Sequence, residues 1–132
     1  MDTFRIGARK GDHLEVSVAA REDGGIDATF EASAAGVGAR DRATLRAGAF
    51  ERFRDALLAL DEGGPNEALF AADDRSLQVR ISRAAAEGFV AECVVVGASS
   101  GGSVLKLVVK LDAAQLAELL WALDAIARDA QS

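Results

Sequence analysis

The chain has 132 residues, half of them apolar and 27% charged, which is typical of a folded domain and excludes a disordered chain. Its formal net charge is −6, and residues 61–132 hold eleven acidic and six basic side chains, a net of −5. An acidic surface repels phosphate backbones, so we expect no nucleic-acid partner and, among charged partners, a basic protein. The alternative is that this charge only keeps the protein in solution.

Alternation of apolar and polar residues with a period of two dominates the first third of the chain. Leu14, Val16 and Val18, for example, alternate with more polar neighbours. Strands with one buried and one wet face show this pattern, and they usually form antiparallel sheets. The pattern predicts strands at 4–8, 14–20 and 26–32, and a weaker one at 37–45.

The period then changes to that of a helix. An apolar stripe at i, i+3, i+7 and i+10 begins at Phe50 and predicts an amphipathic helix over 47–62. Gly63 follows this stripe. Glycine enters the left-handed conformation of a helix cap at little cost, so Gly63 predicts the end of the helix.

Strands return after this helix, at 67–71, 77–82, 89–96 and 105–111. The third of them ends in Val94-Val95-Val96 without alternation, which predicts that both faces of its end are covered. Asp112 then offers a carboxylate to the free amides of a first helical turn, and it predicts the start of a final helix. The apolar stripe of that helix runs from Leu116 to Ala127.

The elements follow the order ββββ-α-ββββ-α. Strands that are grouped, with a helix after each group, argue against the alternating strands and helices of a Rossmann chain. We therefore predict an α+β fold, with a mainly antiparallel sheet and two helices packed on it. We expect residues 1–132 to form a single domain.

The sequence indicates neither a secretion signal nor a membrane span. The first residues carry an acid and lack the apolar segment of a signal peptide. The longest uncharged segment, 93–105, is interrupted by glycines and serines and is shorter than the roughly 20 apolar residues of a membrane span. The single cysteine, Cys93, excludes an intrachain disulfide. We therefore expect a cytoplasmic protein without a membrane contact.

Patterns typical of catalytic or metal sites are weak. Residues 97–101 match the G-x-S-x-G nucleophile elbow, but a strand is predicted after them and the only histidine, His13, comes earlier. We expect His13 to be a partly exposed turn residue and Cys93 a small buried hydrophobe, because a zinc site needs three or four ligands. We thus expect no catalytic, cofactor-binding or metal-binding residue and no enzyme activity. A small-molecule-binding domain stays open, since pockets form from residues distant in sequence.

Trp121 is the unusual residue of the final helix. At 100° per residue it points roughly 160° away from the centre of the apolar stripe, beside Ala114, Ala117 and Ala125. Either another element of the chain covers it, or it contacts a partner, because tryptophan is enriched at binding hot spots. The second interpretation predicts a homodimer through the Trp121 face, and with it a homo-oligomeric scaffold or regulatory binding module.

Nearly the whole chain resembles the WapI-type immunity family, small bacterial proteins encoded beside contact-dependent or polymorphic toxins. The resemblance is carried by apolar spacings in strands and helices. They are Phe4-Arg5-Ile6, Leu14-Glu15-Val16, Ala28 to Ala32, the helix stripe Phe50, Phe53, Leu57 and Leu60, Leu77 to Ile81, Gly88-Phe89-Val90, Leu105 to Leu111, and Leu116, Leu119 and Leu123.

The resemblance implies that the protein neutralises a cognate bacterial toxin by stoichiometric binding in the cytoplasm. Nuclease toxins bind anionic substrates, so an acidic inhibitor is able to occupy their substrate cleft. The alternative is that acids in turns are only solvated. The acids that we expect to contact a toxin cluster around turns of the C-terminal half: Asp61, Glu62, Glu67, Asp73 and Asp74.

Overall fold

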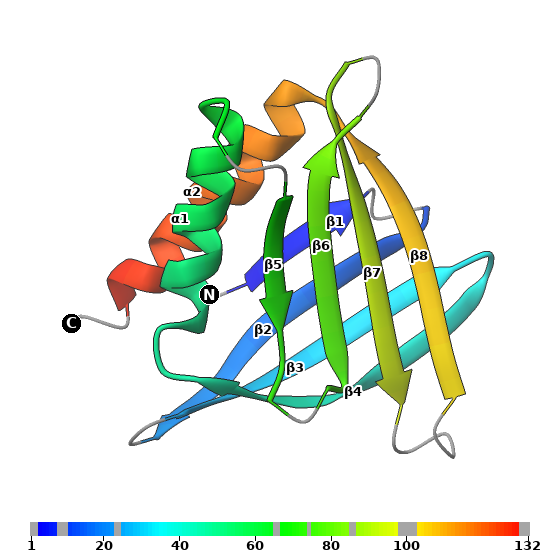
Figure 1. Ribbon diagram of the computed structural model, residues 1–132. Coiled ribbons are helices and arrows are strands. Elements are labelled where there is room, and N and C mark those ends of the chain that lie inside the picture. The colour runs from blue at the N-terminus through cyan, green and yellow to red at the C-terminus, as the bar shows by residue number, and fades with distance from the viewer. Residues whose placement is uncertain are drawn as a thin grey trace.

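The computed structural model describes residues 3–7, 11–22, 25–64, 67–73, 75–84, 87–97 and 103–129. Its elements follow the predicted order ββββ-α-ββββ-α, and the α+β fold is confirmed (Figure 1). The first group comprises β1 (Thr3–Gly7), β2 (His13–Glu22), β3 (Gly25–Ala34), β4 (Val37–Arg46) and α1 (Ala49–Asp61). The second comprises β5 (Glu67–Ala71), β6 (Leu77–Arg83), β7 (Phe89–Gly97), β8 (Ser103–Leu111) and α2 (Ala113–Asp129).

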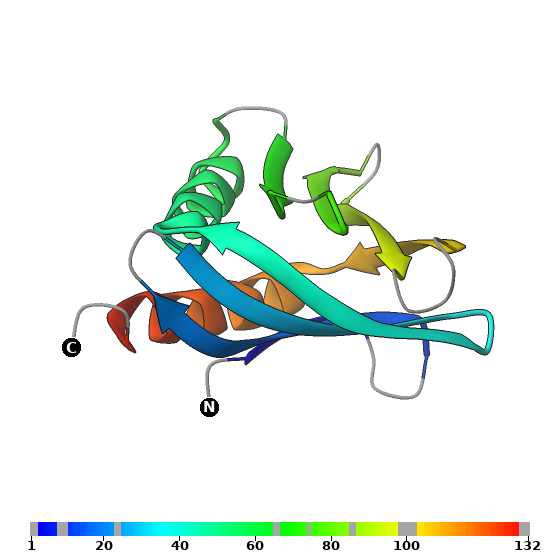
Figure 2. The ribbon, with the colours of Figure 1, turned by 90° about the horizontal axis from the view of Figure 1, so that it is seen from below.

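The strands form two antiparallel sheets, whereas the sequence suggested one. Sheet A has the order β1-β2-β3-β4 and sheet B the order β5-β6-β7-β8. Each is a meander of sequential neighbours. The chain between β4 and β5 is taken up by α1, so β5 starts a new sheet instead of pairing with β4. The sheets face each other with their strands crossing obliquely, and both helices lie together on one side of them (Figures 1 and 2).

One hydrophobic core fills the space between the two sheets and the helices. Alternation along the strands decides which residues enter it, as in β6, where Leu77, Val79 and Ile81 are buried and their neighbours are not. Four phenylalanines from β1, α1 and β5 meet in this core with ring centroids 5.1 to 6.2 Å apart: Phe4, Phe50, Phe53 and Phe70. This aromatic cluster joins sheet A, α1 and sheet B.

Both predicted helix caps are present. Gly63 has a φ of +93° and donates its amide to the Leu60 carbonyl at 3.2 Å, which ends α1 as expected. At the start of α2 the Gln115 amide donates to Asp112 Oδ1 at 2.7 Å, and the Asp112 amide donates to Gln115 Oε1 at 2.9 Å. This reciprocal pair is a capping box. Neither helix, in the part of the chain that is described, has the length and apolar character needed to cross a membrane.

Candidate functional site

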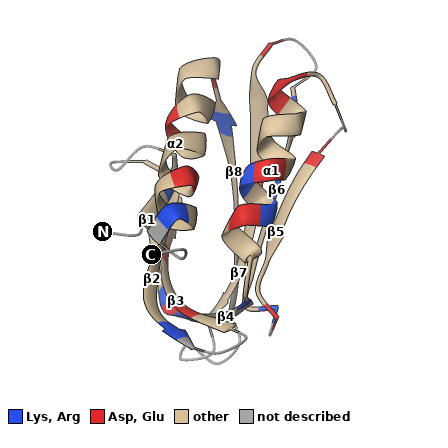
Figure 3. Ribbon diagram, turned by 90° about the vertical axis from the view of Figure 1, so that its left-hand side faces the viewer, with Lys and Arg blue, Asp and Glu red and all other residues tan. Residues whose placement is uncertain are grey.

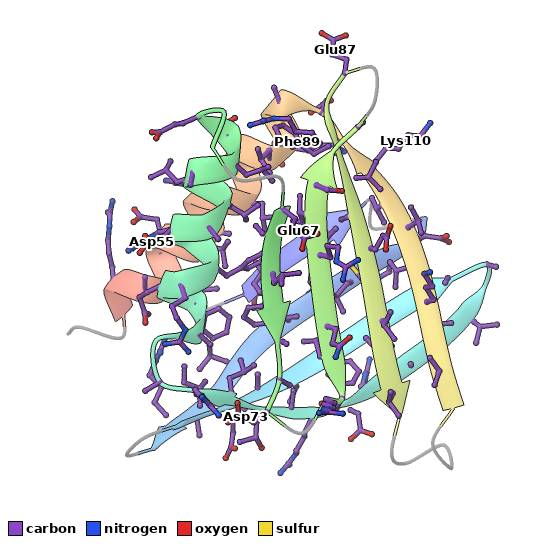
Figure 4. All side chains as sticks on the ribbon, viewed as in Figure 1. Asp55, Glu67, Asp73, Glu87, Phe89 and Lys110 are labelled. Atoms are coloured by element: carbon purple, nitrogen blue, oxygen red, sulfur yellow. The ribbon has the colours of Figure 1, made fainter. Side chains whose placement is uncertain are left out.

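The acids expected to contact a toxin do not form one patch. Asp61 and Glu62 lie at the end of α1, and Glu67 begins β5 nearby, whereas Asp73 follows the other end of that strand (Figure 4). A strand rises about 3.3 Å per residue, so Glu67 and Asp73 lie roughly 20 Å apart. Asp74 lies outside the described residues.

Two of these acids also have basic partners. Glu67 pairs with Arg80 of β6 at 3.4 Å, and Asp73 pairs with Arg46 at the end of β4 at 3.3 Å. Exposed pairs of this kind contribute little to stability, but each arginine offsets the negative charge that its carboxylate presents to a partner. Asp61 and Glu62 are exposed on a helix end. Contact between these acids and a toxin therefore stays a prediction, and it would involve two separate ends of β5.

The residues considered for chemistry lie where the sequence placed them. Cys93 is fully buried in β7, and this burial raises the pKa of its thiol from 9.0 to about 12, so it stays protonated and unreactive. His13 is half-buried at the start of β2, with Nδ1 2.9 Å from the Gly11 carbonyl oxygen. Within the described ranges, no group of three or more His, Cys, Asp or Glu side chains is arranged to hold a metal ion.

The serine motif is only partly visible. Residues 98–101 of the G-x-S-x-G match lie outside the described residues. Its two flanks are strands, because β7 ends at Gly97 and β8 begins at Ser103. A nucleophile elbow requires a helix after the serine, so this location between two strands disfavours the hydrolase interpretation.

Exposed large apolar side chains gather in two places. Three of the six found among the described residues lie on sheet B and point away from the core, two lie on the helices, and the last is in β4 next to the β3–β4 turn. Single exposed apolar residues are normal, so only the grouped ones need an explanation. The six are Leu69, Val104 and Val108, then Leu58 and Trp121, then Val37.

The sheet B outer face, meaning the side turned away from the core, combines aliphatic and charged residues. Its cross-strand rows follow from the register of the four strands. Val96 lies directly opposite Val104, and Val94 lies diagonally opposite Val104 and Val108. The rows are Glu67-Ser82-Val90-Lys110, Leu69-Arg80-Glu92-Val108, Ala71-Gln78-Val94-Lys106 and Val96-Val104.

The valine run of β7 accounts for part of this face. The sequence predicted cover on both faces of the strand end, and in the isolated chain this cover is complete on one face and partial on the other. Val95 is fully buried, but Val94 and Val96 remain half-exposed, because both helices lie on another side of the molecule and the described part of the chain places nothing over them. We call the contiguous valines of β7 and β8 the valine strip: Val90, Val94, Val96, Val104 and Val108.

A shallow depression lies across the middle of the sheet B outer face. Its volume is about 380 Å³, and it extends from Leu69 on β5 to Val94 and Lys106 on β7 and β8. Arg80 and Glu92 line it between these strands. Glu67 and Lys110, labelled in Figure 4, lie in the next row along the sheet. The face therefore has apolar residues next to charges of both signs.

The outer face of sheet A is different because it is polar throughout. Arg5 pairs with Glu15 at 2.8 Å, and Arg40 pairs with Glu31 at 2.7 Å. The four residues lie in one cross-strand row, with Glu15 and Glu31 opposite each other. A depression of about 470 Å³ lies here, and Glu15, Glu31 and Arg40 of its lining are already in ion pairs. This face offers a partner little apolar area.

Trp121 is exposed. No other described element of the chain covers it, so of the two interpretations of the sequence, contact with a partner is the one that remains. The Trp121 side chain is 78% exposed on α2, and Ala117 and Ala125 beside it are exposed too. Leu58 of α1 is 45% exposed, and the two helices lie side by side (Figure 3), joined by the 3.4 Å pair of Arg54 and Asp124. We call this surface the helical patch: Leu58, Ala114, Ala117, Trp121 and Ala125.

Comparisons with known proteins identify a fold but no family. No family model matches the sequence, and no curated protein matches it. One similar solved structure comes from crystal structures of MRP1/MRP2 of Trypanosoma brucei, with a TM-score of 0.59, 16% identity, and coverage of 98% of this chain and 86% of that one. Another belongs to a guide-RNA-binding protein complex bound to a guide RNA, with a TM-score of 0.58, 15% identity, and coverage of 98% and 92%. At these identities the similarity shows a shared fold alone.

Proposed function

We propose that this protein acts by binding another protein through the sheet B outer face, without catalysing a reaction. The observation that carries the proposal is the valine strip, together with Leu69, on an uncovered face of the sheet. Covering aliphatic surface contributes about 25 cal/mol per Å², and each side chain contributes only for its exposed part, which is 55 to 65% for Leu69, Val104 and Val108 and less for the other three valines. A partner that covers several of these residues therefore gains a large part of its binding free energy here.

The arrangement of charges on this face fits a protein partner. Protein interfaces have an apolar centre with polar and charged residues at the rim. On this face the basic residues Arg80, Lys106 and Lys110 and the acidic residues Glu67 and Glu92 are interspersed with the valines, and Arg80 and Glu92 lie between Leu69 and Val108 instead of at a rim. Charges of both signs fix the register of a partner, whereas the chain's net charge of −6 steers a basic protein towards it.

The specific form of the proposal is an immunity-type inhibitor. The sequence resemblance to WapI-type immunity proteins supports a cognate bacterial toxin as the partner, neutralised in the cytoplasm by stoichiometric binding. Blocking a toxin requires a preformed, complementary surface and no catalytic group. The sheet B outer face supplies such a surface, because it is built on paired strands whose other face is buried in the core.

The test combines protection of cells with one matched pair of variants. Val108→Glu lies in the valine strip, and Val37→Glu introduces the same charge at a residue of similar exposure, 55% against 59%, next to the β3–β4 turn. We expect the unmodified protein and Val37→Glu to protect cells that express the toxin domain encoded beside it. Val108→Glu should bind that domain roughly 30-fold more weakly or worse, a loss typical of a hot spot, and should fail to protect.

The outcomes separate the two parts of the proposal. Absence of protection by the unmodified protein would contradict toxin immunity. Protection that Val108→Glu retains at full strength would contradict the sheet B outer face as the binding surface.

A second candidate function is binding of single-stranded RNA. It is supported by the fold shared over 98% of this chain with a protein of a guide-RNA-binding complex, and by Arg80, Lys106 and Lys110 on sheet B. Two observations argue against it. All six phenylalanines are buried, the chain has no tyrosine, and the one tryptophan lies on α2, so the sheet B outer face offers no aromatic ring for base stacking. The net charge of −6 also repels a phosphate backbone.

A further inference from the structure

The helical patch has the features of a contact surface that the sheet B proposal leaves unused. Trp121 projects from the outward side of α2, with Ala117 one turn before it and Ala125 one turn after it. Small side chains on both sides of a large one let a second helix approach closely while its own residues pack around the indole. Tryptophan at such a position is a frequent hot spot of interfaces.

The helix that carries Trp121 is held firmly in place. Arg21 of β2 donates to the Ile126 carbonyl oxygen at 3.0 Å, and Arg54 of α1 pairs with Asp124 at 3.4 Å. Leu116, Leu119 and Leu123 are buried on the other side of α2. A surface that is already ordered loses little conformational entropy when it is covered, which favours association.

We propose that the helical patch is a homodimer interface, in which α2 packs antiparallel on α2 of the partner subunit about a twofold axis. A homodimer through the Trp121 face was one of the two interpretations that the sequence left open. The occupant is a second copy of this chain because the charges of the patch are self-complementary. Glu118 and Asp124 on α2 are matched by Arg128 on α2 and Arg54 on α1. Asp55 also pairs with Arg54, at 3.2 Å, so these five side chains carry a net charge of −1, a small part of the −6 of the whole chain.

The charges also select one register of the two helices. When Trp121 lies opposite Ala125 of the partner subunit, Glu118 lies opposite Arg128 of the partner subunit, and the twofold axis repeats both contacts. When Trp121 instead lies opposite its own copy, Glu118 faces Asp124 of the partner subunit, and like charges repel. Arg128 donates to Asp124 Oδ2 within its own helix at 2.5 Å, and its side chain is 75% exposed, so its guanidinium is accessible to a partner.

This interface and the sheet B outer face are compatible. The sheet B outer face points towards the viewer in Figure 1, where both helices lie to the left of the sheets, and Figure 3 shows the helices from that left-hand side. A dimer through α2 therefore leaves both copies of the valine strip open. The proposal is independent of the proposed function, since the variants that test it lie on another face.

Sedimentation equilibrium with intrinsic fluorescence tests the dimer. Trp121 is the only tryptophan, so its emission should shift to the blue as the protein is concentrated and the indole is covered. Trp121→Glu should sediment as a monomer, and Val37→Glu, which adds a charge elsewhere on the surface, should remain a dimer. A monomer for the unmodified protein at its highest soluble concentration would overturn the proposal.

A charge exchange tests the register. Glu118→Arg places two arginines opposite each other in a homodimer, and Arg128→Glu places two glutamates there. Each variant alone should associate roughly tenfold more weakly than the unmodified protein. An equimolar mixture should recover dimerisation, because each contact in the mixed dimer then joins an arginine and a glutamate. A mixture that associates no better than either variant would refute the antiparallel arrangement.

Discussion

Phe4 of β1 and Phe70 of β5 meet edge to face in the core, with their ring centroids 5.5 Å apart and an interplanar angle of 87°. The two residues belong to different sheets, and Phe50 and Phe53 of α1 pack against both of them. The sheets share no hydrogen-bonded strand pair among the described strands. Packing of this aromatic cluster is therefore a principal link between sheet A and sheet B.

Truncating one side chain of this aromatic cluster should destabilise both sheets together. We expect Phe70→Ala to lower the free energy of unfolding by about 3 to 5 kcal/mol, through lost burial and the cavity that remains. The neighbouring change Leu69→Ala affects a side chain that is 56% exposed on the opposite face of β5, so it should cost about 0.5 kcal/mol or less. Urea denaturation followed by circular dichroism measures both. Two separate transitions would contradict a core shared by the sheets.

The capping box of α2 gives a second stability prediction. Asp112→Ala removes the carboxylate that accepts the Gln115 amide and should cost about 1 kcal/mol, measured as a lower urea midpoint at an unchanged slope. Asp61→Ala is the matched control, and its expected change in the free energy of unfolding has the opposite sign. Asp61 is exposed in the last turn of α1, where a negative charge is unfavourable, so its removal should be neutral or stabilising by a few tenths of a kcal/mol. Equal losses for both variants would contradict a role of the cap.

The fold class was predictable because its signals are local. Alternation around Val16 and Val79 identifies strands, and Gly63 and Asp112 mark helix ends through their own backbone and side-chain chemistry. The division into two sheets was not predictable in this way. Alternation states which face of a strand is buried, but it contains no information on which strand is its neighbour, so the break between β4 and β5 became visible only with the register.

The candidate surfaces were predictable to different degrees. Trp121 was found from the helical period, because the angle between it and the apolar stripe depends on α2 alone. The valine strip had a signal too, the missing alternation at Val94 to Val96, but the sequence does not tell whether cover comes from the same chain or from a partner. The acids from Asp61 to Asp73 are close in sequence, yet β5 separates them, because an extended strand moves the chain far with few residues.

The buried thiol of Cys93 predicts how stability responds to alkali. Burial raises its pKa from 9.0 to about 12, so between these pH values the unfolded chain loses a proton that the folded chain keeps. The unfolded state then binds fewer protons, and stability falls with rising pH by up to about 1.4 kcal/mol per unit, whereas below pH 9 the contribution of the thiol is complete. The difference in unfolding free energy between the unmodified protein and Cys93→Ala, measured from neutral to alkaline pH, should shrink above pH 9. A constant difference would contradict the raised pKa.

Thiol chemistry provides an independent reading of the same burial. The folded protein should react with an aromatic disulfide reagent at mildly alkaline pH only as fast as it opens, and one thiol per chain should react after denaturation in urea. Rapid reaction of the folded protein would show that β7 opens locally, and it would revive Cys93 as a candidate nucleophile.

The last prediction concerns the choice between a protein and an RNA as partner of sheet B. Phosphate contacts by Arg80, Lys106 and Lys110, without a stacking aromatic ring and against a net charge of −6, should give only weak binding of single-stranded RNA. We expect a Kd of about 10⁻⁴ M at physiological salt, the weak end of non-specific binding, measured by the fluorescence anisotropy of a labelled oligonucleotide. Submicromolar binding whose salt dependence decreases in Lys106→Glu and Lys110→Glu would instead assign this face to RNA.

Because Val108→Glu removes apolar contact and also adds negative charge, the isosteric change Val108→Thr separates the cases: it should weaken binding of a protein and leave binding of a polyanion nearly unchanged.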